Sequence, residues 1–127
     1  MKHLLILASM LVGVANAAEP PVVAPLLLKE LGDIPGKEAL VITVAYPPGG
    51  ADPVHRHPAH AFVYVLEGSI VMQMEGDAPV TLHAGQVFYE KPGQVHTVGR
   101  NASNTKPAKF LVVLIKDKGA EAVLPPN

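Results

Sequence analysis

The sequence predicts an all-β fold in a single domain. Residues 39–46 are rich in β-branched side chains, which is typical of a buried strand. After this run, short apolar segments alternate with Gly and Pro at regular intervals, a pattern that favours a β-sandwich or barrel. No stretch of helical length shows a convincing 3.6-residue periodicity. A chain of 127 residues suits one domain of this kind.

Two less regular segments flank the predicted β domain, which covers residues 39–117. Residues 18–38 are predicted to be an N-terminal extended segment, Pro-rich at its start, with a short strand or turn near 26–31. Residues 118–127 are predicted to be a flexible tail. Within the domain, further strands are expected near residues 54–57, 61–66, 69–75, 79–82, 87–90, 95–100 and 109–116.

The first seventeen residues have the pattern of a secretory signal peptide. A short basic start precedes an apolar run from Leu4 to Val14, and an A-x-A site ends at Ala17. We therefore predict cleavage between Ala17 and Ala18. The apolar run is shorter than the ~20 residues that a membrane-spanning helix needs, so a soluble periplasmic protein is expected.

Composition narrows the possible partners. The formal net charge is −1 and the chain has no run of basic residues, which argues against nucleic acid and against a membrane surface as partners. There is no cysteine, so an exported chain of this kind must be stabilised by packing, a metal or oligomerisation and not by disulfides. A small-molecule ligand or substrate is the expected partner because of the metal site described next.

Three histidines indicate a metal site. His55 and His57 are two residues apart, so on a strand both side chains point to the same face. His96 follows a predicted tight turn and can meet them from another strand. Three imidazoles make half of an octahedral shell for a first-row metal. They must be neutral to bind, and an ordinary imidazole pKa near 6.5 permits this at neutral pH.

These residues carry a resemblance to the cupin superfamily, whose first motif reads G-x5-H-x-H-x3,4-E-x6-G and whose second reads G-x5-P-x-G-x2-H-x3-N. The resemblance implies a jelly-roll β-sandwich (a double-stranded β-helix), a metal held by His55, His57 and His96, and a homodimer, which the apolar N-terminal segment also favours. Matches to the two motifs are Gly49, His55, His57 and Gly68, then Gly85, Gly93 and His96, with Pro92 and Asn101 each one residue late.

The fourth metal ligand stays open at this point. Ala61 stands where the cupin motif has its ligating Glu. Either the site has three histidines, as in the superfamily's cysteine dioxygenases and diketone-cleaving enzymes, or a bulge re-aims the adjacent His60 as a fourth ligand. Loss of the carboxylate would leave the site one charge more positive, and so would favour an anionic or bidentate ligand from the substrate.

Other polar residues are weaker catalytic candidates. Tyr89 and Glu90 precede a predicted turn and could move a proton or orient substrate if they face inward. Arg100 and Arg56 could bind a carboxylate at the mouth of a pocket. No phosphate-binding loop, nucleophile elbow or pair of catalytic carboxylates is evident.

Three functions therefore compete. The first is a three-histidine metal enzyme, favoured as a dioxygenase, that holds one divalent ion; iron is favoured, with Mn, Ni, Cu and Zn as alternatives. The second is a periplasmic protein that binds a metal or small ligand without turnover. The third is an isomerase or epimerase that works without metal and uses the histidines as general bases.

Overall fold

The computed structural model describes residues 17–127, and the predicted signal peptide therefore lies almost wholly outside the described residues. Nine strands make up the described part of the chain. From β2 onward, the strands lie within two residues of the sequence prediction. The bounds are β1 (Val22–Glu30), β2 (Lys37–Tyr46), β3 (His55–Arg56), β4 (Ala59–Glu67), β5 (Ser69–Met74), β6 (Val80–His83), β7 (Val87–Glu90), β8 (Val95–Asn101) and β9 (Ala108–Asp117).

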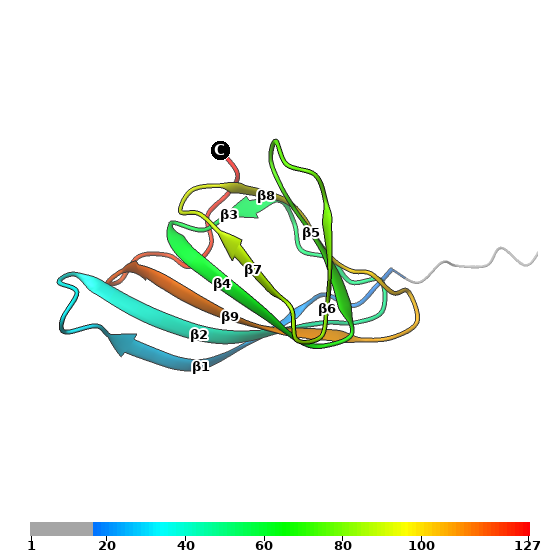
Figure 1. Cartoon of the computed structure of the whole chain (residues 1–127), viewed down its shortest axis with the longest axis horizontal. Coiled ribbons are helices and arrows are strands. Elements are labelled where there is room, and N and C mark those ends of the chain that lie inside the picture. The colour runs from blue at the N-terminus through cyan, green and yellow to red at the C-terminus, as the bar shows by residue number, and fades with distance from the viewer. Residues whose placement is uncertain (1–16) are drawn as a thin grey trace, which may run out of the picture.

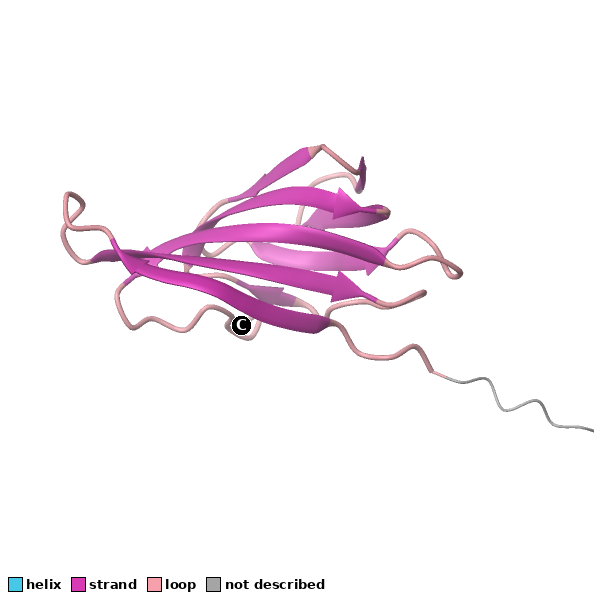
Figure 2. Ribbon diagram, turned by 90° about the horizontal axis from the view of Figure 1, so that it is seen from below, coloured by secondary structure: helices cyan, strands magenta, loops and turns pink. Residues whose placement is uncertain are grey.

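The strands form two facing sheets. One has the order β1-β2-β9-β4-β7 and the other β3-β8-β5-β6. All neighbouring strands are antiparallel. Figure 1 shows the smaller sheet arching over one end of the larger, and Figure 2 shows the long strands of the larger sheet side by side. The predicted all-β sandwich is confirmed. Residues 17–127 contain no helix long and apolar enough to span a membrane.

Alternation of side chains along β4 and β9 builds the core between the sheets. In β4 the residues Ala59, Ala61, Val63 and Val65 are buried, and the residues between them are exposed. β9 pairs with β4 and alternates in the same way, which places Phe110, Val112 and Leu114 on the inner face. Each large apolar side chain buried in this way stabilises the fold by roughly 1.5–3 kcal/mol.

The N-terminal segment differs from the prediction of an extended lead-in. Its residues 22–30 form a full edge strand that pairs with β2, with a register shift between Pro25 and Leu27. Proline has no N–H to donate to a ladder, so it is confined to edges and bulges of this kind. The strand leaves apolar side chains exposed: Val22, Val23, Leu26, Leu27 and Leu28.

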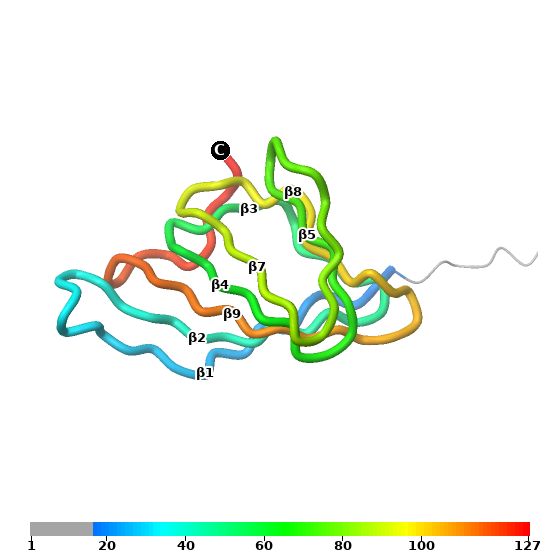
Figure 3. The backbone as a smooth tube through the Cα atoms, viewed as in Figure 1, coloured from blue at the N-terminus to red at the C-terminus, as the bar shows by residue number. Residues whose placement is uncertain are grey.

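The C-terminal segment was predicted to be a flexible tail, but the structure gives it specific contacts. Leu124 exchanges two backbone hydrogen bonds with Arg56, of 2.8 and 3.1 Å. Ala122 packs against the core. Near the end of β9, the buried Lys116 ammonium donates to Glu38 Oε1 at 2.5 Å and to the Ala120 carbonyl of this segment at 2.7 Å. In the tube of Figure 3, this red segment returns beside β3.

Gly68, in the turn between β4 and β5, lies against the backbone that leads into β9. Its φ is +71°, and an added Cβ would lie 2.6 Å from the Pro107 carbonyl oxygen. Gly68→Ala should lower the free energy of unfolding by about 3 kcal/mol or more, because left-handed strain and a backbone clash add.

Gly76→Ala is the matched control. Its φ is +85°, but nothing lies within 4 Å of an added Cβ, so only the left-handed strain of about 1–2 kcal/mol applies. Urea denaturation of both variants measures the difference. Equal losses in the two would show that the close approach at Gly68 does not constrain the fold.

Candidate metal centre

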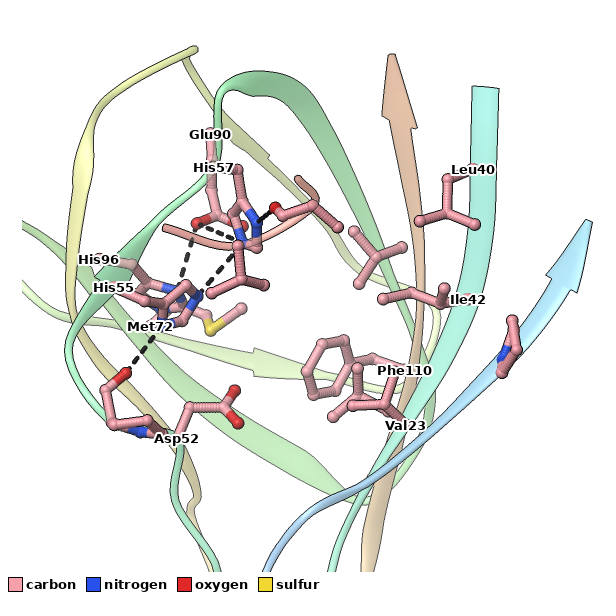
Figure 4. A pocket seen from close by; sticks show the side chains of 16 residues that line it. Val23, Leu40, Ile42, Asp52, His55, His57, Met72, Glu90, His96 and Phe110 are labelled. Carbon is pink, nitrogen blue, oxygen red and sulfur yellow. Dashed lines mark hydrogen bonds and ion pairs between the residues drawn. The ribbon is translucent and has the colours of Figure 1, made fainter. Parts of the chain in front are cut away.

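The smaller sheet brings the three predicted histidines together. His55 lies on β3 and pairs directly opposite His96 on β8. His57 follows β3 two residues after His55, so both project to the same side. One ring nitrogen from each histidine lies within 4.8 Å of the other two. All three rings are largely buried and face the interior between the sheets, as Figure 4 shows.

Backbone carbonyls fix the protons on two of these rings. His55 Nδ1 lies 2.7 Å from the Pro53 carbonyl oxygen, and His57 Nδ1 lies 2.7 Å from that of Ala122. A carbonyl only accepts, so each Nδ1 carries the hydrogen and donates it. In the neutral rings both Nε2 atoms therefore present lone pairs, and these atoms are 3.2 Å apart. Two facing lone pairs repel each other unless a cation lies against both.

Burial favours the neutral form of His57 and His96. Desolvation lowers the pKa of His57 and lowers that of His96 to about 4, because the charged form loses its hydration; the nearby His55 adds to the lowering in both cases. Neutral imidazole is the form that binds metals. Both ring nitrogens of His96 are buried without a hydrogen-bond partner. Buried polar atoms are seldom left unpaired, so the donor set fits a transition-metal ion.

Glu90, one of the weak catalytic candidates, does lie in this centre. It ends β7 and is only 2% exposed. Its Oε1 lies 3.2 Å from His96 Nδ1 and 4.0 Å from His57 Nε2, yet makes no hydrogen bond. Desolvation and, to a lesser extent, the charge of Asp52 raise the pKa of this carboxyl to about 7.

The other candidates lie outside the centre. His60 is exposed on the opposite face of β4, with its ring stacked on Tyr89 and its Nδ1 2.6 Å from the Tyr89 hydroxyl. The strict alternation of β4 has no bulge at this position, so the His60 side chain is directed away from the three histidines. Tyr89 is 44% exposed on that outer face. Arg100 is exposed and donates to the Asn101 carbonyl. Neither Tyr89 nor Arg100 reaches the histidines.

A cavity of about 340 Å³ opens beside the histidines. Its walls come from both sheets and from the C-terminal segment, and Figure 4 shows the histidines at one end and Leu40, Ile42 and Phe110 toward the other. Apart from the three histidines, Asp52 and Glu90, the lining side chains are apolar: Val23, Pro25, Leu40, Ile42, Val44, Pro53, Met72, Phe110, Val112, Ala122 and Val123.

Asp52 is a site residue that sequence reasoning missed. It lines the cavity, its backbone N–H donates to the Gly99 carbonyl at 2.8 Å, and its Oδ2 accepts a hydrogen bond from the Tyr46 hydroxyl. Tyr46 is fully buried, and desolvation followed by the charge of Asp52 raises its pKa. The signal was present in the sequence, because Asp52 is the one carboxylate between Gly49 and His55.

The family is settled by comparison with known proteins. A family model described as the cupin domain matches residues 42–114, which is more than half of the chain. The chain belongs to the cupin superfamily.

Individual relatives agree with this assignment. The chain is 37% identical over 86 residues to germin-like protein subfamily 2 member 2 of Arabidopsis thaliana, a match that covers 61% of this chain but only 38% of the plant protein. It is similar in structure to a protein with a double-stranded β-helix domain from Klebsiella pneumoniae, with 22% identity, a TM-score of 0.66, and coverage of 87% of this chain and 89% of that one. It is also similar to an oxalate oxidase in complex with the substrate analogue glycolate, with 22% identity, a TM-score of 0.64, and coverage of 93% and 62%. These structures share the cupin fold, the predicted double-stranded β-helix.

The charge of this cupin's site differs from the sequence expectation. Loss of the motif glutamate at position 61 was expected to leave a positive site that favours anions. Instead, two carboxylates, Asp52 and Glu90, line the cavity, and no Lys or Arg is among its described lining residues. Arg56 is turned away and donates from Nε to the Pro125 carbonyl at 2.9 Å. The charged side chains of the described lining are therefore acidic and not basic.

We predict that the untagged protein holds about one transition-metal ion per chain and that His57→Ala lowers this content at least tenfold. The variant removes the Nε2 lone pair that faces His55 Nε2. Elemental analysis after dialysis measures the content. His60→Ala, which removes an exposed histidine of the same chain, should keep the wild-type content. Equal metal in the wild type and His57→Ala would contradict the assignment.

Proposed function

We propose that this cupin is an exported metal enzyme that acts on a small, mainly apolar organic molecule bound in the cavity, with dioxygenation as the favoured reaction. The observation that carries the proposal is the pair of Nε2 lone pairs 3.2 Å apart at the end of an apolar cavity of about 340 Å³. A metal held there is next to the space in which an organic molecule would bind. Sites of this kind serve as reaction centres because positions on the ion stay open.

Three side chains would hold the ion: His55, His57 and His96. Iron, the favoured metal, would supply coordination positions for dioxygen and for an oxygen donor of the substrate. In a dioxygenation both atoms of O₂ enter the product, so the electrons come from the substrate and no other reductant is needed. The protein's own part is to fix the rings through the Pro53 and Ala122 carbonyls and to exclude water with apolar walls.

The lining of the cavity indicates the substrate class. Two carboxyl groups, those of Asp52 and Glu90, line the cavity, and no Lys or Arg is among its described lining residues. A small dicarboxylate of the kind that an oxalate oxidase takes would therefore gain little here. An apolar molecule with one hydroxyl or carbonyl oxygen suits the cavity better, since its body can pack on Ile42, Val44 and Phe110.

Asp52 would act as the proton acceptor for a substrate hydroxyl. Asp52 lines the cavity outside the histidine cluster, and its Oδ2 accepts a hydrogen bond from the Tyr46 hydroxyl. Because the Tyr46 hydroxyl keeps its proton when its pKa is raised, it remains a donor that orients Asp52. A positioned carboxylate of this kind accelerates proton transfer by about 10²–10⁴-fold.

Export and assembly are part of the same proposal. The A-x-A site that ends at Ala17 supports cleavage before Ala18 and a periplasmic location. The edge strand β1 exposes a row of apolar side chains, including Val23 and Leu27. Unpaired edge strands tend to pair with another chain, and this supports a homodimer.

Mass spectrometry of the protein recovered from the periplasm checks export and assembly. The intact mass should match a chain that begins at Ala18, and a retained leader would contradict the cleavage. The native mass should be that of a dimer, and a monomer would contradict the assembly.

The iron-loaded protein should consume one O₂ per molecule of product with at least one neutral compound from a panel of catechols, flavonols and diketones. Thiols and oxalate serve as the polar comparison, and His57→Ala is the inactive control. Oxygen-electrode measurements with product analysis decide the outcome. Binding without oxygen uptake throughout would support a non-catalytic binding protein. Turnover unaffected by a chelator would support a metal-independent isomerase.

With a substrate from this panel, Asp52→Asn should lower kcat by about 100-fold or more, because the amide cannot accept the proton. The metal content should stay at the wild-type level, since Asp52 lies outside the histidine cluster. Asp77→Asn removes an exposed carboxylate from a turn and should leave kcat unchanged. An unchanged kcat in Asp52→Asn would remove this residue from the reaction.

A further inference from the structure

Ala61 and Glu90 occupy directly opposed positions in neighbouring strands. In the antiparallel pair β4–β7, the register places Ala61 opposite Glu90. Both residues are buried, at 0% and 2% exposure, so their side chains share the inner face of the sheet. Directly opposed residues have Cβ atoms about 4.5–5.5 Å apart. A side chain from position 90 can therefore enter the space in front of position 61, which the small alanine leaves free.

We propose that Glu90 of β7 supplies the metal-binding carboxylate that the cupin motif places at position 61 of β4. The proposal rests on the proposed function, since it needs a metal at the histidine cluster. The site would then have three histidines and one carboxylate, and the carboxylate would come from β7 instead of from β4.

The distances are those of ligands that share one ion. With metal–ligand bonds of about 2.1 Å, adjacent donor atoms in an octahedral shell lie about 3.0 Å apart and opposite ones about 4.2 Å apart. Glu90 Oε1 lies 4.0 Å from His57 Nε2, the nitrogen whose lone pair faces inward. The two inward nitrogens of His55 and His57 are 3.2 Å apart. The 4.0 Å separation is therefore close to that of opposite donors around one ion, and a small movement of Glu90 would bring Oε1 to the three ring nitrogens, which lie within 4.8 Å of one another without it.

Hydrogen bonding does not account for the position of this carboxylate. Oε1 is buried and has no hydrogen-bond partner, although His96 Nδ1 lies 3.2 Å away. That nitrogen is also unpartnered, because the ring and the carboxylate are not aligned for a hydrogen bond. A buried carboxylate oxygen without a partner is costly. A cation beside it would satisfy Oε1 and the facing lone pairs together.

Cobalt(II) titration of three variants tests the assignment. Glu90→Gln keeps the shape and can still accept a hydrogen bond, but an amide is a poor ligand. Glu90→Ala removes the group. The swap Ala61→Glu/Glu90→Ala returns a carboxylate to β4 with the net charge unchanged. Affinity is measured by competition with a chelator, and the visible spectrum of the bound ion reports changes in its ligands. Glu75→Gln, in which an exposed glutamate is changed, is the control.

The proposal predicts that Glu90→Gln and Glu90→Ala each weaken cobalt binding by about 100-fold or more and change the spectrum, because loss of an outer-shell contact alone costs about 10–100-fold. The swap should recover affinity to within about tenfold of wild type. Two results would overturn the inference but not the proposed metal function. One is wild-type cobalt affinity and spectrum in Glu90→Gln. The other is a loss of only about tenfold in the Glu90 variants that the swap does not repair. Absence of cobalt binding in the wild type would instead overturn the proposed function.

Discussion

The metal centre depends on two histidine side chains whose lone pairs the protein holds facing each other. Two carbonyl oxygens fix the Nδ1 protons of His55 and His57, so their Nε2 lone pairs face each other at 3.2 Å. Burial lowers the pKa of His57 and of His96, so both rings favour the neutral form that binds metals. A divalent cation turns this arrangement from unfavourable to favourable. The same cation would satisfy the unpartnered atoms of His96 and Glu90.

Different elements of the fold contribute the residues of the metal centre. The short strand β3 sets His55 opposite His96, and the C-terminal segment, held to β3 through Arg56 and Leu124, delivers the Ala122 carbonyl to His57. The larger sheet provides Glu90 and the apolar wall. Metal binding should therefore stabilise the docking of the C-terminal segment as well as the centre.

Sequence reasoning found what lies on a single strand and missed what depends on strand pairing. Period-two patterns and the H-x-H spacing were enough to place β2 to β9 and the three histidines. The metal-binding role proposed for Glu90 could not be predicted from the sequence, because it depends on the register of β7 against β4, which no linear motif encodes. Proline content hid the edge strand β1, whose bulge accommodates Pro25. The contacts of the tail could not be predicted because most of them use its backbone N–H and C=O groups, which leave no side-chain pattern in the tail itself.

A crystal grown with the bound metal, and recorded at the absorption edge of that metal, tests the central claim most directly. The account predicts one anomalous peak per chain, within bonding distance of one nitrogen from each of His55, His57 and His96, at the end of the apolar cavity. Rings turned apart with no peak between them, or a peak at the exposed His60 or His83 instead, would contradict it.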